Sequence, residues 1–542
     1  MVTELPSRRD VLRLLGAFSV AQAIDWAVFP RAAGARPSGD TFDAIIIGAG
    51  LGGLSCAAAF VRQGFRPLVL EQRDRAGGYA SSFRVGDFEF DVSLHSTTAT
   101  PDPSGRRHVF GFPELDVEFQ AHPNLYRLIL PNHDLRVPQR DLGAYQQMLI
   151  REFPDQARGL RSFFRELTFL ANDAERFISR KRPPAPGRVP VEFPFLCKHH
   201  KKTWAELVET RIDDPELRAI LSAQWGYFGV SPSRLSALYY GIGAMGYLRK
   251  GGYYPRGTSQ SLSNSFVKAI ESGGGTVLLN RKVVEITTED GVATGVRTAN
   301  GEEYRAKVVV SNADARATFD GMLGEDERLS DYRADLARQP VSMSAFQVFL
   351  GLKKDLVGES GVIDSEVFLQ STYDIDADVR WSRDAEVGRC AMSVTLYDNI
   401  YEGYSPPGKN TLNILVLQGY SHWEPFEADY DAGDTTAYDA ERDRLAALMI
   451  SRVERELLPG LADAIEVQSV ATPLTFARHG GCHRGAIYGF EQVIENSAHR
   501  RTPHVTPIKG LYLSGAWTRP GHGYYAVMLS GLQCFQEIMT RW

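Results

Sequence analysis

The sequence has few cysteines, no basic excess and no long hydrophobic run. Its five cysteines include no CxxC pair, which argues against a disulfide framework and a standard zinc site. No stretch reaches the ~18 consecutive apolar residues that a membrane-spanning helix needs. Lys and Arg number 60 against 66 Asp and Glu, which gives a net charge of -6, so binding to nucleic acid is not expected.

The rest of the composition is typical of a large globular protein. The chain has 542 residues, of which 43% are hydrophobic and 23% are charged. This length predicts about three or four domain-sized units. A chain of this size buries enough apolar surface to need no disulfide or metal for stability.

The N-terminal segment has the pattern of an export signal. A paired arginine, Arg8-Arg9, precedes a modestly apolar run that ends at Ala27, and residues 33–35 are small enough for cleavage. This order predicts a twin-arginine signal and export to the periplasm or cell surface. The alternative is a basic amphipathic helix that stays attached and leaves the protein in the cytoplasm, which Arg13 and Asp25 favour.

A glycine-rich turn follows a short apolar run near the start of the predicted folded region. Residues 42–47 are apolar and mostly β-branched, as expected of a buried parallel strand. Residues 48–53 match GxGxxG, and an Ala-rich helical stretch follows them. A second strand is predicted over residues 66–70, with Glu71 at its end.

Each residue type in this pattern suits a dinucleotide. Gly48 permits the tight turn, Gly50 lets the backbone approach a pyrophosphate, and Gly53 lets the helix pack on the strand. The N–H groups and dipole of the helix N-terminus attract the phosphates. Glu71 can accept hydrogen bonds from both ribose hydroxyls. We therefore expect a dinucleotide to contact Gly48, Gly50, Gly52, Gly53 and Glu71.

A second glycine pair resembles the extension found in flavoproteins with two dinucleotide-binding domains, where it follows the FAD diphosphate, and this resemblance implies a flavin rather than a nicotinamide. Gly77-Gly78 would let the backbone pass close to a ligand that already lies along the first motif. A nicotinamide dehydrogenase has no need of this element. One of Arg73 and Arg75 is expected to face the phosphates and the other to be a solvated surface charge. The further expected contacts in this segment are Gln72, Arg73, Gly77, Gly78 and Ser81.

A second strand–turn–helix pattern lies near the C-terminus. Residues 511–513 are strand-like, a glycine-rich turn follows, and a helix is predicted to begin near Tyr525 or Ala526. The N-terminus of such a helix can stabilise negative charge on a reduced flavin. The expected cofactor contacts here are Gly515, Ala516, Tyr525, Ala526 and Val527.

Together these segments resemble the phytoene desaturase, carotenoid cis–trans isomerase and retinol saturase group of flavoproteins. The resemblance extends from residue 42 to the C-terminus in the family's order. It is carried by residues 48–53, 77–78, 90–92, 252–260, 310–314, 485–489 and 508–531. Two departures are Thr258, where the family often has glycine, and residues 524–526, where the desaturases usually have smaller residues and a glycine.

The resemblance implies an α/β flavoprotein with two dinucleotide-binding domains, in the amine-oxidase-like superfamily. A Rossmann-like FAD domain, a mixed-sheet substrate domain and a helical cap are expected. FAD is the implied cofactor, and Val283 is implied to contact the adenine through its backbone. The expected division is 1–39 signal and linker; 40–139, 251–320 and 481–542 FAD binding; 140–250 helical cap; 321–480 substrate binding.

Local patterns support this division. Asp290-Gly291 and Asn300-Gly301 predict hairpin turns in a β-rich segment that includes residues 276–286 and 308–310. Residues from about 141 to 247 have helical spacing, and residues from about 340 to 418 alternate as strands do.

A basic segment from Arg176 to Lys202 is a candidate membrane contact. It holds eight Lys or Arg residues against one acid, together with the apolar residues 193–196. Basic residues beside exposed aromatics suit an anionic membrane surface, from which a lipid-soluble substrate could enter. The alternative is a solvated, mobile loop.

Three side chains are candidates for the chemistry. The resemblance places His95 near the flavin as a proton donor or acceptor, with an ordinary surface or core histidine as the alternative. Tyr524 and Tyr525 would sandwich a polyene or position a small polar substrate; the alternative is that they shape the pocket mouth. Residues 478–483 contain two histidines and a cysteine, but their spacing fits no standard ligand set, so no metal is expected.

The sequence leaves three functions to compare. The first is an FAD-dependent oxidoreductase that desaturates, saturates or isomerises carbon–carbon bonds of a hydrophobic isoprenoid or polyene through hydride exchange with flavin N5. The second is an amine or amino-acid oxidase that uses oxygen, with Tyr488, Tyr524 and Tyr525 as an aromatic cage. The third is a flavin or lipid carrier without catalysis.

Overall fold

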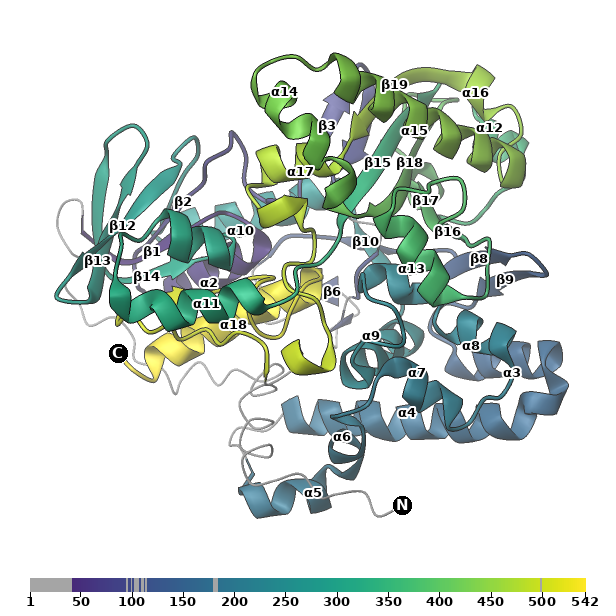
Figure 1. Cartoon of the computed structure of the whole chain (residues 1–542), viewed down its shortest axis with the longest axis horizontal. Helices are drawn as coiled ribbons and strands as arrows, with labels where there is room; N and C mark the ends of the chain where they lie inside the picture. The colour runs from purple at the N-terminus through teal and green to yellow at the C-terminus, as the bar shows by residue number, and fades with distance from the viewer. Residues whose placement is uncertain are drawn as a thin grey trace.

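The computed structural model describes residues 41–93, 96–98, 100–101, 107–108, 112, 115–178, 184–497 and 500–542. The predicted export signal and His95 lie outside these residues. Among the described residues, no helix combines the length and the apolar character needed to cross a membrane. Figure 1 shows three parts: a sheet with helices on both faces, a second sheet, and a group of helices beneath the second sheet.

The first sheet forms around the predicted βαβ unit. Its path is β11-β2-β1-β14-β13-β12, and β20 also pairs with β14. The strands are β1 (Thr41–Ile47), β2 (Pro67–Leu70), β11 (Thr276–Leu278), β12 (Val283–Glu289), β13 (Val292–Thr298), β14 (Glu303–Ser311) and β20 (Leu511–Leu513). The pairs among β11, β2, β1, β14 and β20 are parallel, which brings their carboxyl ends to one edge. The predicted turns at residues 290–291 and 300–301 join the antiparallel strands β12, β13 and β14.

Three helices cover one face of this sheet. They are α2 (Leu51–Arg62), α10 (Thr258–Ser272) and α18 (Tyr524–Met539). The small residues of α2, including Ala57, Ala58 and Ala59, are almost fully buried, so the helix lies close to the sheet. On the opposite face, Ile45 and Val309 pack with Phe319 and with the helix α11 (Ser330–Arg338).

The second sheet has seven strands in the order β19-β15-β18-β17-β16-β8-β9. They are β8 (Tyr126–Leu130), β9 (His133–Val137), β15 (Ser344–Leu352), β16 (Glu366–Leu369), β17 (Met392–Leu396), β18 (Asn410–Gln418) and β19 (Ile465–Ala471). Its outer face is apolar and packs under α15 (Thr436–Glu456), α12 (Leu356–Glu359) and α16 (Leu461–Ala464). Its inner face turns toward the first sheet and the cap (Figure 1).

The cap is helical, as predicted. Its elements are α3 (Leu142–Glu152), α4 (Ala157–Ile178), α5 (Val189–Glu192), α6 (Pro194–His199), α7 (Trp204–Glu209), α8 (Pro215–Leu221), the short helix η4 (Ala223–Tyr227) and α9 (Ala237–Lys250). Buried aromatic and leucine side chains form one core that joins these helices to β8 and β9.

The remaining strands and α-helices lie outside the two large sheets and the cap. They are β3 (Ser82–Val85), β4 (Phe88–Asp91), β5 (Thr100–Pro101), β6 (Arg107–His108), β7 (Phe119–Ala121), β10 (Tyr253–Pro255), α13 (Ile375–Arg383), α14 (Glu427–Asp431) and α17 (Pro473–Gly480).

Two segments depart from the predicted division of the chain. The expected FAD segment 40–139 includes β8 and β9, but these strands pair with β16 in the second sheet. Conversely, α11 falls in the expected substrate segment 321–480, yet its Leu336 packs against the first sheet. In both cases partners distant in sequence decide where the element packs, which local periodicity cannot reveal.

Candidate active site

The first glycine turn leaves backbone exposed at the carboxyl edge of the first sheet. Gly48 has a φ of 92°, a conformation that favours glycine, and its N–H bonds Leu70 O at 2.8 Å. A Cβ atom on Gly53 would lie 2.3 Å from Gly48 O, so only glycine fits there. Gly50 is the N-cap of α2 and makes no side-chain capping bond, and the first-turn N–H groups of a helix have no partner within it.

Glu71 lies beside this turn. Its Oε2 accepts a hydrogen bond from Ala49 N at 2.8 Å, and its Oε1 accepts one from Arg73 N at 2.9 Å. Burial raises the pKa of Glu71, and the backbone N–H groups partly oppose that rise. The loop before Val283 is adjacent, since Arg281 N bonds Glu71 O at 2.7 Å. The structure therefore brings Glu71, Arg73 and the start of β12 together.

The second glycine pair lies against the first turn. Gly77 N bonds Ala49 O at 2.8 Å, and a Cβ on Gly78 would lie 3.4 Å from Gly50 Cα. The Ser81 hydroxyl donates to Gly78 O at 2.7 Å. Arg75 donates to Ser82 O and pairs with its neighbour Asp74, so the local chain already holds its guanidinium. Gln72 is exposed and lies near Gly481.

The C-terminal turn joins the same edge. A Cβ on Gly52 would lie 2.8 Å from Gly515 Cα and 2.4 Å from the Asn312 amide oxygen. Helix α18 crosses α2 so closely that a Cβ on Gly531 would lie 2.2 Å from Gly52 O. Ala526 and Val527 are in the first turn of α18, where Val527 N bonds Gly523 O at 2.9 Å. Asn312, which follows β14, is a contact that the sequence reasoning did not assign to the site.

These segments form a cradle that fits FAD. Gly50, Gly52, Gly78 and Gly515 present backbone without side chains, next to the N-terminus of α2 and the buried carboxylate Glu71. Glycines that admit a pyrophosphate, a helix N-terminus for its charge and an acid for the ribose are the elements that a dinucleotide needs. The residues present therefore fit the cofactor that the sequence predicted.

The two candidate tyrosines have different surroundings. Helix α18 begins at Tyr524, one residue before the predicted start. The Tyr524 hydroxyl donates to Tyr79 O at 3.0 Å, next to the second glycine pair. Tyr525 instead lies within electrostatic reach of Glu175 on α4, in the cap. The proton-transfer role predicted for His95 concerns a residue outside the described part of the chain.

A buried acid that the sequence reasoning did not select lies behind Tyr524. Asp91 is fully buried, and Ser259 and the Tyr404 hydroxyl donate to it. Burial raises the pKa of Asp91 to about 7, against the lowering effect of these bonds. Thr258, the departure noted in the sequence, has a φ of 69°, which explains why glycine is usual there. Asp91 and residues 258–259 lie in two of the motifs on which the family resemblance rests. Those motifs could therefore have pointed to Asp91 as a site residue.

A pocket opens between the inner face of the second sheet and the cap. Its lining comes from η4, β16, β17, β18 and Tyr488, and no described lining residue carries a formal charge. The lining residues are Ala223, Gln224, Trp225, Gly226, Tyr227, Phe368, Gln370, Ala391, Met392, Ser393, Leu415, Leu417 and Tyr488. The Tyr488 hydroxyl donates to Gly226 O at 2.8 Å. His522 Nε2 lies 3.0 Å from Tyr227 O, so the C-terminal turn reaches the pocket wall.

Arg501 holds the C-terminal turn in place. It is fully buried, and its guanidinium donates to the carbonyl oxygens of Tyr488, Phe490, Asn496, Ala516 and Thr518. Burial lowers the pKa of Arg501 to about 10, which leaves the side chain charged at neutral pH. One arginine therefore links a pocket residue, Tyr488, to the expected flavin contact Ala516.

A second buried acid lies behind the pocket wall. Glu366 on β16 accepts hydrogen bonds from Ser393 Oγ at 2.5 Å and Thr395 Oγ1 at 3.0 Å, and Ser393 lines the pocket. Burial raises the pKa of Glu366 to about 8. Its neighbours Val367 and Leu369 point to the outer core, so Glu366 faces the inner side of the sheet.

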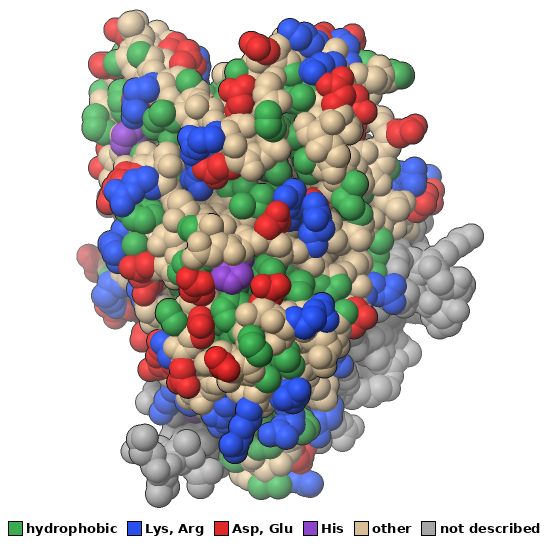
Figure 2. Space-filling view, turned by 90° about the vertical axis from the view of Figure 1, so that its right-hand side faces the viewer, with side chains coloured by type: hydrophobic (Ala, Val, Ile, Leu, Met, Phe, Trp, Pro, Cys, Tyr) green, Lys and Arg blue, Asp and Glu red, His purple; other side chains and the backbone are tan. Residues whose placement is uncertain are grey.

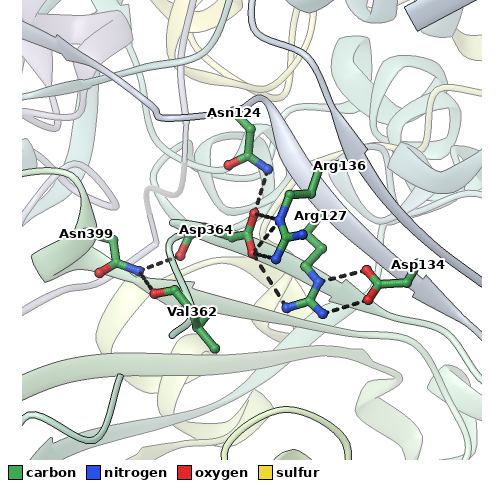
Figure 3. A network of polar contacts seen from close by, with 7 residues as sticks. All are labelled: Asn124, Arg127, Asp134, Arg136, Val362, Asp364 and Asn399. Carbon is green, nitrogen blue, oxygen red and sulfur yellow. Dashed lines mark hydrogen bonds and ion pairs between the residues drawn. The ribbon is translucent and has the colours of Figure 1, made fainter. Parts of the chain in front are cut away.

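A polar network fixes the start of β16 (Figure 3). Asp364 is fully buried and accepts from Arg136 Nε at 2.9 Å and Asn124 Nδ2 at 2.8 Å. Arg127 lies 3.6 Å from Asp364 and also pairs with Asp134 at 2.7 Å. The network ties β16 to β8 and β9, and so holds Glu366, two residues after Asp364, on the inner face. Among the described residues, no group of three His, Cys, Asp or Glu side chains could hold a metal ion.

Comparison with known proteins agrees with this geometry. An all-trans-retinol 13,14-reductase from Danio rerio is 25% identical, covering 93% of this chain and 86% of the relative. Prolycopene isomerase 1 from an Oncidium hybrid cultivar is 25% identical, covering 98% and 90%. A neurosporene-forming phytoene desaturase from Rhodobacter capsulatus is 28% identical, covering 90% and 92%.

The fold matches solved structures over most of the chain. A putrescine oxidase bound to putrescine superposes with a TM-score of 0.59 at 17% identity, covering 92% of this chain and 99% of that one. Residues 51–539 match the family described as flavin containing amine oxidoreductase. The chain therefore belongs to the flavin containing amine oxidoreductase family, and its cofactor is FAD.

Proposed function

We propose that this flavin-dependent oxidoreductase acts on carbon–carbon bonds of a hydrophobic isoprenoid or polyene, by desaturation, saturation or cis–trans isomerisation. The observation that carries the proposal is the uncharged pocket, with Phe368, Met392, Leu415 and Leu417 in its wall. The pocket reaches the C-terminal glycine turn through His522. The relatives named for retinol, prolycopene and phytoene support the same class of substrate.

FAD supplies a two-electron acceptor or donor when it is bound. We propose that the glycines of the cradle, Glu71 and Arg73 bind FAD, and that Val283 contacts the adenine. These are residues that the sequence analysis predicts as cofactor contacts. The aromatic wall around Tyr488 orients the polyene and excludes water. Glu366, which bonds the pocket residue Ser393, holds a proton at a carboxyl oxygen next to the pocket. Asp91, whose pKa burial raises to about 7, can take up or release a proton near Tyr524 at neutral pH.

The alternative, an amine or amino-acid oxidase, needs an aromatic cage and often a charged anchor. Tyr488 bonds Gly226 O in the cap, whereas Tyr524 bonds Tyr79 O beside the glycine cradle. No described lining residue offers a charge to an ammonium or carboxylate group. Both observations favour the polyene.

Product analysis tests the proposal. The purified holoenzyme would be incubated with polyenes in liposomes, and the products would be separated and weighed by mass spectrometry. Loss of two hydrogens means desaturation, gain of two means saturation, and an isomer of unchanged mass means isomerisation. Peroxide formation with amines and no change in any polyene would contradict the proposal.

We also propose that the cap contacts an anionic membrane. Val191 on α5 is 81% exposed and Phe169 on α4 is 45% exposed, and the Phe169 ring stacks on that of Phe195. On the face in Figure 2, Lys and Arg side chains gather at the lower end, where the cap lies. Residues 179–183 of the basic segment are outside the described chain. Vesicle sedimentation tests this contact: binding to anionic vesicles that Val191→Glu weakens is expected, and equal binding to neutral vesicles would contradict it.

For localisation, we propose export by the twin-arginine route. The support is the Arg8-Arg9 pair, the modest apolar run and the small residues 33–35. Residues 1–39 fused to a folded reporter should direct it out of the cytoplasm, and replacing both arginines by lysine should stop export. Retention of the unmodified fusion in the cytoplasm would contradict the proposal.

A further inference from the structure

Two glutamine side chains at the pocket have hydrogen-bonding atoms that are unpaired in the part of the chain that the structure describes. Gln224 on η4 is 5% exposed and Gln370, which follows β16, is 4% exposed. The Gln370 amide nitrogen donates to Ala223 O at 3.2 Å, which places it beside η4. Gln370 Oε1 and Gln224 Nε2 are buried, and no described residue forms a hydrogen bond with either atom. Both residues line the same pocket.

The unpaired atoms constrain the ligand. A buried polar group that is left without a hydrogen bond destabilises the complex. A pure hydrocarbon that filled this pocket would leave Gln370 Oε1 and Gln224 Nε2 unpaired and remove any water that serves them. A ligand oxygen in their reach would satisfy them. The pocket therefore discriminates in favour of an oxygen-bearing ligand.

The pairing of donor and acceptor narrows the chemistry further. The amide N–H of Gln224 can donate, and the amide oxygen of Gln370 can accept. A hydroxyl group does both, since its oxygen accepts while its proton is donated. A carboxylate would face the Gln370 oxygen without a counter-charge, because no described lining residue is Lys, Arg or His.

The size of the pocket indicates which part of the ligand it takes. It encloses about 50 Å³, well below the ~300 Å³ of the smaller pockets for whole ligands. This space suits the end group of a long molecule. Tyr227 and Tyr488 in the same lining contact His522 of the C-terminal turn, so the polyene chain can extend from this end toward the flavin cradle.

We propose that Gln224 and Gln370 bind a hydroxyl group at the end of the substrate, which makes the substrate a polyene alcohol rather than a hydrocarbon. The inference rests on the proposed function and deepens it. Because the two glutamines act in binding, they set specificity and do not take part in the transfer of hydride or protons.

The test compares a polyene alcohol with its deoxy analogue, in which a methyl group replaces the terminal hydroxymethyl group. Quenching of tryptophan fluorescence would give Kd for each, because Trp225 lines the pocket; turnover would give kcat/KM. A site built to bond a hydroxyl rejects an analogue that lacks it, so we expect the alcohol to be preferred by roughly 10- to 100-fold in both quantities. The double variant Gln224→Leu, Gln370→Leu should bring this ratio to within about threefold.

Leu415→Met is the matched control, because Leu415 lies on the inner face of β18 in the same lining and the change introduces no hydrogen-bonding nitrogen or oxygen, so the variant should keep the preference. Each variant needs unchanged flavin content and thermal unfolding. The comparison in the unmodified enzyme stands even if a variant fails to fold. Equal binding and turnover of the two polyenes by the unmodified enzyme would overturn the inference and leave the proposed function intact. A preference that survives in the folded double variant would also overturn it. Failure of both polyenes to bind oxidised or reduced enzyme would instead contradict the proposed function, and the inference with it.

Discussion

The imidazole ring of His522 stacks on the phenol ring of Tyr488, with centroids 4.2 Å apart and planes inclined by 28°. Tyr488 belongs to the pocket, and His522 belongs to the turn that precedes α18. The stack therefore couples the substrate side of the site to the flavin side. Burial, with a smaller effect from the nearby Arg501 charge, lowers the pKa of His522 to about 3, so the ring is neutral at physiological pH.

Loss of the Tyr488 ring should weaken substrate binding. Tyr488→Leu removes both the stack and the hydrogen bond to Gly226 O, and we expect a rise in the polyene Kd of about 10-fold. Tyr488→Phe keeps the stack and removes only the hydrogen bond, so its effect should be smaller. Fluorescence titration of both variants measures the difference. Equal Kd values for the unmodified enzyme and the leucine variant would show that Tyr488 does not shape the binding site.

Glu366 should make stability depend on pH. Its pKa is about 8 in the folded protein and near 4.5 in the unfolded chain. Between these values the folded state holds the proton more tightly, so the free energy of unfolding falls as pH rises from about 4.5 to 8, by at most ~1.4 kcal/mol per pH unit for this group. Below pH 4.5 the Glu366 carboxyl is protonated in both the folded and the unfolded state, so the cost of burying its negative charge is absent.

The variant Glu366→Gln stays neutral at every pH and can keep bonds to Ser393 and Thr395. Relative to the unmodified protein, it should gain stability steadily from about pH 4.5 to 8 and no further above that. Urea unfolding across this range measures the gain. The exposed Glu303→Gln is the control and should leave the pH dependence unchanged. A parallel pH dependence in Glu366→Gln and the unmodified protein would contradict the assigned pKa.

Close packing at the glycine cradle should make flavin binding sensitive to single methyl groups. Gly53→Ala would place a Cβ 2.3 Å from Gly48 O, and Gly531→Ala would place one 2.2 Å from Gly52 O. Either change must displace α2 or the turn, and we expect most of the bound flavin to be lost. Gly246→Ala in α9 is the matched control, since nothing lies within 4 Å of its Cβ. The ratio of flavin to protein absorbance after purification measures the bound flavin. Full flavin content in Gly53→Ala would contradict the proposed role of this turn in flavin binding.

Loss of the Arg501 side chain should destabilise the C-terminal turn. Arg501→Met leaves five carbonyl oxygens without this donor, and we expect a loss of roughly 3 kcal/mol in the free energy of unfolding, together with faster release of flavin. Arg500→Met is the control, because within the described part of the chain the Arg500 side chain donates to one carbonyl oxygen, that of Ile494. Urea unfolding and flavin release rates give the comparison. Equal stability of the two variants would show that the contacts of Arg501 are redundant.

Local sequence signals predicted the parts of the site that depend on neighbouring residues. The strand, glycine turn and helix at residues 42–62 needed only a run of apolar residues and correctly spaced glycines, and the structure has them. The hairpin turns at residues 290–291 and 300–301 are also confirmed; Asp290, Gly291 and Gly301 adopt the left-handed backbone conformation that such turn residues favour.

The parts that depend on distant partners were not predicted. Glu366 is one polar residue in a buried strand, and its inner-face position depends on Asp364 meeting Arg136 from β9, far away in sequence. Arg501 has no charged partner among the described residues, so charge patterning gives no sign of its role. The placement of β8 and β9 in the second sheet depends on the pairing of β8 with β16, for which neither strand carries a local signal.

The central claim is that the FAD enzyme exchanges electrons with a polyene. Anaerobic titration of the purified holoenzyme, followed by flavin absorbance, tests it most directly. Polyene alcohols, hydrocarbon polyenes and amines would each be added to oxidised and to prereduced enzyme. Bleaching of oxidised flavin by a polyene, reoxidation of reduced flavin by a polyene, or isomerisation that needs reduced flavin is the predicted result. Bleaching of the flavin by an amine, with no response to any polyene, would contradict the account. No change in flavin absorbance with any compound, and no isomerisation, would indicate a flavin or lipid carrier rather than an enzyme.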